Sequence, residues 1–319
     1  MRSYCVVGLS LACIAAGSLH PAHAQPCASD PGKLGVSRTV VIDTAAGPRF
    51  GAQYKDAGFL GDGEVVLTFD DGPSRAYSRP ILDALAAHCT KATFFMVGRM
   101  ALADPAMVKE IADQGHTIAT HTWSHANLGQ VASRTAEAEI ELGVSAVRHA
   151  LGKPIAPFFR FPYLRDTGAA LGHLGARNLA IFSIDVDSKD YLTTSAAAVV
   201  ERVLRELAAR RRGIILLHDI HASTARAVPT LLAELKARRF KVVHIRPKAD
   251  ALTIAEFDVQ AVEQAKRRQL AGDRRPLATR TVTWPATVLS GQAERPDPPV
   301  RPAPRAQPQD DWISKIWRW

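Results

Sequence analysis

Ionisable side chains stand directly after several short apolar runs of the sequence. Asp70 and Asp71 follow the apolar residues 65–69. His121 directly follows residues 117–120, and His125 stands four positions later. Three further runs end in the same way, at Arg160, at Asp185 with Asp187 and Asp190, and at His218 with Asp219. Side chains at the carboxyl ends of parallel strands in a barrel converge on one rim, where active sites lie. We therefore expect these residues to form one catalytic site.

The residue types indicate metal-assisted hydrolysis. Two adjacent carboxylates, Asp70 and Asp71, repel each other, and burying them is costly without a compensating charge. Two imidazoles and one carboxylate form a three-ligand site with an open position, which is typical of catalytic zinc. A bound dication would compensate one aspartate and leave the other free as a base, which Arg160 could keep ionised. Taken alone, residues 70–73 also fit an ordinary turn, and the histidine pair with the later segments favours the metal site.

Strand-like and helix-like segments alternate between these residues. Apolar runs predict strands at residues 38–43, 64–69, 91–97, 117–120, 158–161, 179–184, 213–217 and 241–245. Amphipathic spacing and end signals predict helices at residues 78–88, 105–114, 133–151, 168–176, 195–211 and 224–238. Continuously apolar strands belong in a parallel sheet covered by helices. The pattern indicates an α/β fold of about seven βα units, which fits a barrel better than an open sheet.

Five segments, in this order, resemble the motifs of the carbohydrate esterase family 4 polysaccharide deacetylases, which share the NodB-homology fold. They are TFDDG at 68–72, HTWSH at 121–125, RFPY at 160–163, DSKDY at 187–191 and LLH at 216–218. The resemblance covers residues 62–245. It implies a distorted (β/α) barrel with about seven parallel strands and the hydrolytic removal of acetyl groups from a glycan.

The same resemblance implies a role for each matching residue. The implied catalytic residues are Asp70 as base, Arg160 as its partner, the main chain of Tyr163 as oxyanion donor, and His218 as acid supported by Asp190. The implied ligands of a divalent metal, most readily Zn²⁺ with Co²⁺ as the alternative, are Asp71, His121 and His125. Leu216 and Tyr191 are implied to line the substrate groove. Tyr191 stands where the family often has Trp, which leaves the substrate preference open, and we interpret His221 as loop structure.

The expected function is removal of N-acetyl groups from a glycan such as peptidoglycan, a chitin-type chain or an exopolysaccharide. One alternative is an O-acetyl esterase acting on a xylan-type polysaccharide, and another is a catalytically inactive glycan-binding protein. An ester leaves more readily than an amine, so an esterase would depend less on an acid at His218. Nucleic acid is not expected as a partner, because the 40 basic residues behind the net charge of +9 are spread along the chain.

The two ends of the chain have their own character. Arg2, the apolar residues 5–17 and the Ala-His-Ala sequence at 22–24 predict a signal peptide over residues 1–24, and hence a secreted or periplasmic protein. The deacetylase domain is expected over residues 25–246. Residues 247–319 are rich in Pro and Arg and are predicted to be a disordered tail. Its end, WISKIWRW, could associate weakly with a membrane or cell wall, or could simply be a frayed end.

Two cysteines, Cys27 and Cys89, remain after removal of the signal peptide. In an oxidising compartment they are a candidate disulfide, and the alternative is two unpaired thiols.

Overall fold

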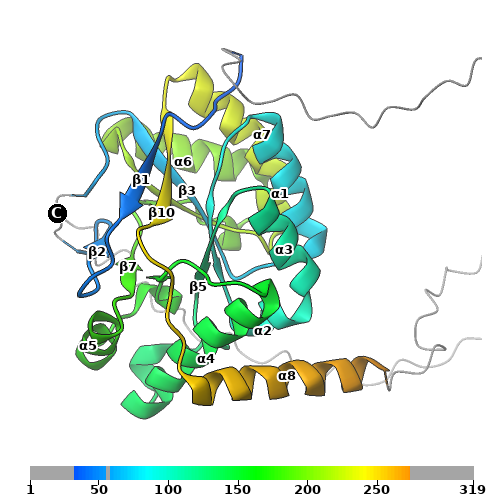
Figure 1. Cartoon of the computed structure of the whole chain (residues 1–319). Coiled ribbons are helices and arrows are strands. Elements are labelled where there is room, and N and C mark those ends of the chain that lie inside the picture. Colours follow the sequence, from blue (N-terminus) through cyan, green and yellow to red (C-terminus); the bar gives the residue numbers. More distant parts are fainter. Residues whose placement is uncertain (1–31, 55–57, 274–319) are drawn as a thin grey trace, which may run out of the picture. The chain divides into compact units, whose positions relative to one another are not determined.

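The computed structural model describes residues 32–54 and 58–273 (Figure 1). The predicted signal peptide, Cys27 and the tryptophan-rich end lie outside the described residues, so the expectations about them stay predictions. Within the described part of the chain, no helix has both the length and the apolar character needed to cross a membrane.

The strands form one parallel sheet in which neighbours in space are often distant in sequence. The strands are β1 (Arg38–Ile42), β2 (Arg49–Phe50), β3 (Glu64–Asp70), β4 (Thr93–Met96), β5 (Thr117–Thr120), β6 (Phe158–Phe159), β7 (Ala180–Phe182), β8 (Val186–Asp187), β9 (Gly213–His218) and β10 (Lys241–Pro247). Their order is β1-β10-β3-β4-β5-β6-β7-β2, and β3 also pairs with β9, which pairs with β8. Every ladder is parallel. The predicted α/β fold, a distorted (β/α) barrel, is confirmed.

The distortion lies between β7 and β8. These two strands follow each other in the chain, yet no ladder joins them among the described residues, and the short β2 pairs with β7 instead. Ser183 donates its backbone N–H to the Phe50 carbonyl, and Asp185 donates its own to the Ile214 carbonyl on β9. The chain thus changes partner between residues 183 and 185, which opens the barrel on that side.

Helices cover the outside of the sheet. They are α1 (Arg75–Ala87), α2 (Gly98–Ala103), α3 (Pro105–Asp113), α4 (Ser133–Leu151), α5 (Gly168–Ala176), α6 (Ala196–Arg210), α7 (Ala222–Ala237) and α8 (Ala255–Asp273). Helix α1 packs on α7, α7 on α6, and α4 on α2, α3 and α8. Short 3₁₀ turns at Leu128–Gln130, Pro162–Leu164 and Asp190–Leu192 follow strand ends or loops near the candidate site.

The core has two parts because successive side chains of a strand point to opposite faces. Val65, Leu67 and Phe69 of β3 pack outward against the helices. Val66 packs in a second cluster with Phe95, Phe158 and Phe182, which fills the inside of the barrel. Thr68 and Asp70 continue the inward face of β3, so alternation alone directs Asp70 into the barrel at the carboxyl end of the strand.

The prediction that the chain is disordered from residue 247 onward is wrong for residues 255–273. These residues form α8, which lies alongside α4 in Figure 1. Ala261 is completely buried, and Arg148 of α4 forms an ion pair with Asp258 at 3.5 Å. Few apolar residues of α8 reach the core, and most of its surface is polar. Its apolar periodicity is therefore too weak to separate it by sequence from a solvated tail.

Candidate active site

The two adjacent aspartates point in different directions. Asp70 ends β3 facing inward and is buried, while Asp71 has a positive φ of 76°, which turns its side chain away from the strand direction. Asp71 donates its backbone N–H to the Phe95 carbonyl of β4 at 3.2 Å. The left-handed conformation is unfavourable for a residue with a Cβ. The change in backbone conformation between the two residues separates their carboxylates.

Arg160, immediately after β6, is fully buried and holds Asp70. Its Nη1 donates to Asp70 Oδ1 at 2.7 Å and to Thr68 Oγ1 at 2.8 Å. Its Nε and Nη2 donate to the carbonyls of Phe182 and Ser183, and its guanidinium lies 4.3 Å from the centre of the Phe95 ring. Four acceptors and an aromatic face therefore fix both the charge and the orientation of Arg160.

The environment of Asp70 raises its pKa to about 6. Burial is the largest cause, and the neighbouring charge of Asp71 adds to it, whereas Arg160 and His218 oppose it. A carboxyl group with a pKa in this range can accept a proton near neutral pH and release it again.

His121 directly follows β5 and is held through both its backbone and its ring. Its N–H donates to the Met96 carbonyl, and its Nδ1 lies 2.7 Å from the Arg160 carbonyl. A carbonyl can only accept, so Nδ1 carries the proton and Nε2 presents a lone pair. Burial lowers the pKa of His121 well below its ordinary value, which keeps the ring neutral.

His125 reaches the same place from a tight loop that rests on α4. The loop is held by Glu139, whose carboxylate accepts from Ser124 N at 2.8 Å and Ser124 Oγ at 2.7 Å. Gly143 allows the close approach, because a Cβ there would lie 2.6 Å from the carbonyl carbon of Thr122. Burial lowers the pKa of His125 below its ordinary value, so this ring is also neutral near pH 7.

Asp71, His121 and His125 bring their ligand atoms together. Asp71 Oδ1 lies 3.2 Å from His125 Nε2 and 3.5 Å from His121 Nε2, and it is buried without a hydrogen-bond partner among the described residues. His121 Nε2 and Asp71 Oδ1 are both acceptors, so a cation shared between them would make their proximity favourable. Bond lengths of about 2.0–2.2 Å in a tetrahedral site separate ligand atoms by about 3.4 Å, which fits these distances. The three residues therefore fit a metal ion.

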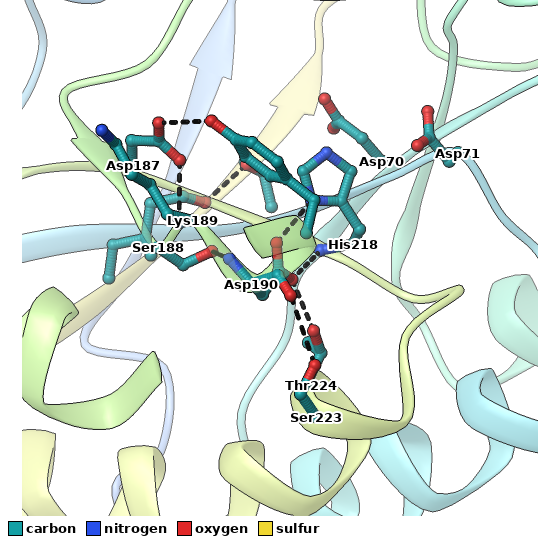
Figure 2. Close-up of polar contacts among 12 residues, drawn as sticks. Asp70, Asp71, Asp187, Ser188, Lys189, Asp190, His218, Ser223 and Thr224 are labelled. Carbon is teal, nitrogen blue, oxygen red and sulfur yellow. Dashed lines mark hydrogen bonds and ion pairs between the residues drawn. The ribbon is translucent and has the colours of Figure 1, made fainter. Parts of the chain in front are cut away.

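His218 and Asp190 form a second buried pair beside the carboxylates (Figure 2). Asp190 Oδ1 lies 2.7 Å from His218 Nδ1, and Asp190 Oδ2 accepts from the His218 N–H at 2.8 Å and from the Thr224 hydroxyl. Burial alone would lower the pKa of His218, but the charge and hydrogen bond of Asp190, together with the charges of Asp71 and Asp70, raise that pKa to about 9. The imidazole is therefore a cation at neutral pH, with Nε2–H available to a substrate.

A cleft of about 590 Å³ joins these groups, and both carboxylates, both metal-facing histidines and His218 line it. Tyr191 also lines the cleft, edge-on to His218, with its hydroxyl donating to Asp187 Oδ2 at 3.1 Å. Leu216, almost fully buried, adds an apolar patch to the floor. The cleft thus places the metal-facing residues, a buried carboxylate and a cationic imidazole around one space.

Tyr163 occupies the wall next to His125. Its backbone has a positive φ of 58°, its ring is half exposed, and the ring centre lies 4.7 Å from that of His125. The following turn is anchored by Asp166, whose Oδ2 accepts from the Tyr54 hydroxyl at 2.9 Å and Gln53 Nε2 at 3.0 Å. Residues after β2 therefore support this wall of the cleft.

Comparison with known proteins agrees with this geometry. Residues 59–178 match the family model described as polysaccharide deacetylase. A chitooligosaccharide deacetylase of Sinorhizobium fredii is 34% identical over 155 residues, which span 49% of this chain and 71% of that protein.

The chain belongs to the polysaccharide deacetylase family. A peptidoglycan-N-acetylglucosamine deacetylase of Listeria monocytogenes is 33% identical over 181 residues, which are 57% of this chain and 38% of that longer protein. A solved peptidoglycan deacetylase of Bdellovibrio bacteriovorus is similar with a TM-score of 0.62 and 32% identity, covering 68% of this chain and 60% of that chain.

The structure brings together the motif residues that the sequence predicts for the site. Those that line the cleft are Asp70, Asp71, His121, His125, Tyr163, Tyr191, Leu216 and His218. Arg160 and Asp190 join them through their hydrogen bonds to Asp70 and His218. Cys89 is disulfide-bonded, while Cys27 lies outside the described residues, so their pairing stays a prediction. His221 lies with its ring 5.8 Å from that of His218 and caps the start of α7 without a side-chain cap bond.

Three supporting residues of the site carry no local sequence pattern. Glu139, Asp166 and Ser78 act through side-chain contacts with residues separated from them in sequence, namely Ser124, Tyr54 and Asp219. Asp185 and Asp219 are expected in the site because they stand at strand ends, but neither lines the cleft in the structure. Asp185 Oδ2 instead accepts from the Ile214 N–H at 2.7 Å.

Proposed function

We propose that the chain is a metal-dependent hydrolase that removes N-acetyl groups from a glycan containing N-acetylglucosamine. The observation that carries the proposal is the convergence on one cleft of a buried carboxylate fixed by arginine, an Asp-His-His ligand set and a cationic histidine. Amide hydrolysis needs these functions together, because an amine is a poor leaving group unless it is protonated. The relatives named above support peptidoglycan or a chitin-type oligosaccharide as the substrate class.

In this proposal Asp71, His121 and His125 hold a divalent cation. The ligand types favour Zn²⁺, with Co²⁺ as the alternative, and the ion would supply Lewis acidity toward water and the acetyl carbonyl. Because the imidazole lone pairs are free near neutral pH, the chain is prepared to bind the ion without first losing protons from His121 and His125.

The chain's own residues would carry the proton transfers. Asp70 accepts the proton of the attacking water, and Arg160 keeps it ionised and aimed into the cleft. The Tyr163 N–H donates to the developing oxyanion, a contribution of about 3 kcal/mol for one well-placed donor. His218 then gives its Nε2 proton to the leaving nitrogen. The ring regains a proton from solvent, and the charge of Asp190 stabilises the imidazolium that results.

The cleft walls would select the acetylated sugar. Leu216 offers an apolar seat for the acetyl methyl group, and the exposed ring of Tyr191 can pack on a sugar face. The predicted signal peptide over residues 1–24 supports a secreted or periplasmic location, where such glycans occur. A weak association of the C-terminal end with membrane or cell wall stays a prediction.

Acetate release from a panel of glycans tests the proposal. The panel comprises N-acetylglucosamine oligomers, peptidoglycan fragments and O-acetylated xylan, each with the purified full chain, with and without a chelator. We expect chelator-sensitive release from N-acetylated substrates and its loss in His218→Ala. Release from the xylan ester alone, with little effect of His218→Ala, would instead identify an esterase. No release from any substrate by zinc-loaded protein would identify an inactive glycan-binding protein.

A further inference from the structure

A buried carboxylate behind the metal-facing residues has no part in the proposed chemistry. Asp219 directly follows His218 and is only 1% exposed. Asp219 does not line the cleft. Its carboxylate accepts a hydrogen bond from Ser78 Oγ of α1, which is an uncharged donor. A buried carboxylate is costly, so its presence at this place requires a reason.

Asp219 connects three segments that meet behind the cleft. Its backbone N–H donates to the Asp70 carbonyl at 3.3 Å, which extends the contact between β3 and β9 beyond their last paired residues. In its ionised form the carboxylate can only accept, so it then orients the Ser78 hydroxyl toward itself. The oxygen of that hydroxyl then accepts the Ser74 N–H at 2.8 Å. One side chain thereby links the end of β9, the start of α1 and the loop between β3 and α1.

The carboxylate also packs directly on the backbone of this loop. A Cβ on Gly72 would lie 2.1 Å from Asp219 Oδ1 and 2.2 Å from Oδ2, so only glycine permits the contact. Gly72 is the neighbour of Asp71, whose positive φ of 76° is unfavourable by about 1 kcal/mol or more. A strained residue keeps its conformation only when its surroundings hold it.

We propose that Asp219 is a positioning residue that fixes the loop of residues 71–74, and so aims the Asp71 carboxylate at the two histidines. The inference rests on the metal site of the proposed function. It assigns Asp219 a mechanical role through the Ser78 hydroxyl and the Gly72 backbone. Its negative charge is not needed for that role.

Zinc affinity of the metal-free full chain tests this role without an activity assay. The dissociation constant is measured by competition with a chromophoric chelator, and circular dichroism confirms folding. Asp219→Ala should weaken zinc binding about 10–100-fold, the usual effect of losing a residue that supports a ligand. Ser78→Ala should weaken it about 3–10-fold, as expected for one hydrogen bond. Asp219→Asn keeps the shape and an acceptor for Ser78, so its affinity should remain within about threefold of wild type.

Two matched variants control for general destabilisation. Glu141→Gln alters another buried carboxylate, paired with His173 and Arg177 away from the cleft, and Ser145→Ala removes another buried serine hydroxyl. Both should bind zinc with wild-type affinity.

Wild-type zinc affinity in folded Asp219→Ala and Ser78→Ala would overturn the proposal. Equal weakening in Asp219→Asn and Asp219→Ala would also overturn it, because charge rather than position would then be responsible. If Asp219→Ala does not fold, Ser78→Ala with its Ser145→Ala control decides. A wild-type chain that binds zinc but releases no acetate would refute the proposed function and leave the positioning role intact, whereas absence of zinc binding would refute both.

Discussion

Replacing Asp190 by asparagine should remove the proton from His218 at neutral pH. In the native chain Asp190 is the main group that raises the pKa of His218, against burial, to about 9, and the charges of Asp71 and Asp70 add to its effect. Asparagine keeps the shape but not the charge, so the pKa falls from about 9 toward its ordinary value, while the charges of Asp71 and Asp70 still oppose burial. A fall to the ordinary 6.5 is a change of about 2.5 pKa units, which at 1.36 kcal/mol each corresponds to about 3 kcal/mol less stabilisation of the imidazolium.

The consequence for activity follows from these values. At pH 7.5 a group with a pKa of about 9 is about 97% protonated, whereas one with a pKa of 6.5 is about 9% protonated. Loss of the acidic form alone should therefore reduce kcat/KM at pH 7.5, by up to about tenfold when the pKa reaches 6.5. The alkaline limb of the kcat/KM profile, which reports the free enzyme, should move from near pH 9 toward pH 6.5.

Two measurements check this result. The pH profile of acetate release from an N-acetylglucosamine oligomer gives the alkaline limb, and an NMR titration of the His218 ring gives its pKa directly. Glu141→Gln is the matched control, because Glu141 contacts His173 at 2.7 Å, the distance between Asp190 and His218. The reasoning is refuted if His218 in Asp190→Asn still titrates near 9, or if Glu141→Gln shifts the alkaline limb equally.

Three further substitutions test other parts of the site. Arg160→Met leaves Asp70 as a buried carboxylate without its partner, so chemical denaturation should show a loss of about 3–5 kcal/mol in unfolding free energy. The double variant Arg160→Met/Asp70→Asn should be more stable than Arg160→Met alone. A double variant that is less stable would contradict the pairing. His125→Ala should weaken zinc binding, measured by chelator competition, by more than about 100-fold. This loss exceeds the effect of removing a residue that only supports a ligand. Near-native affinity would exclude His125 as a ligand. Tyr191→Phe removes the hydrogen bond to Asp187, which is worth about 1 kcal/mol. The KM for an N-acetylglucosamine oligomer should therefore rise about fivefold, and kcat should stay within about twofold of the wild-type value. An unchanged KM would show that the hydroxyl does not shape the groove.

The parts of the fold that could be predicted have strong local signals. Helix α4 begins and ends as predicted, because Gly152 adopts a left-handed conformation at its end and its N–H bonds to the Arg148 carbonyl. Helix α5 begins where the Thr167 side chain caps it by accepting from the Ala170 N–H. In contrast, the two-residue strands β2 and β8 are too short to show any periodicity, so only tertiary pairing defines them.

The site residues could be predicted because the carboxyl ends of parallel strands in a barrel all lie on one rim. Alternation along β3 places Asp70 on the inward face, and the next residue turns away. Sequence could not show that Arg160 would also reach the Phe182 and Ser183 carbonyls, or that Asp219 would pack on Gly72. Those contacts depend on where the barrel opens and on how closely two loops approach, which no local pattern encodes.

Titration of metal-free protein with zinc, with acetate release measured at each step, tests the central claim most directly. The full chain is stripped with chelator, and an N-acetylglucosamine oligomer serves as substrate. We predict no release without metal, a linear rise to a plateau at one zinc per chain, and no rise in His125→Ala at the same zinc concentrations. Full release by metal-free protein, or zinc-dependent release that survives in His125→Ala, would contradict the account.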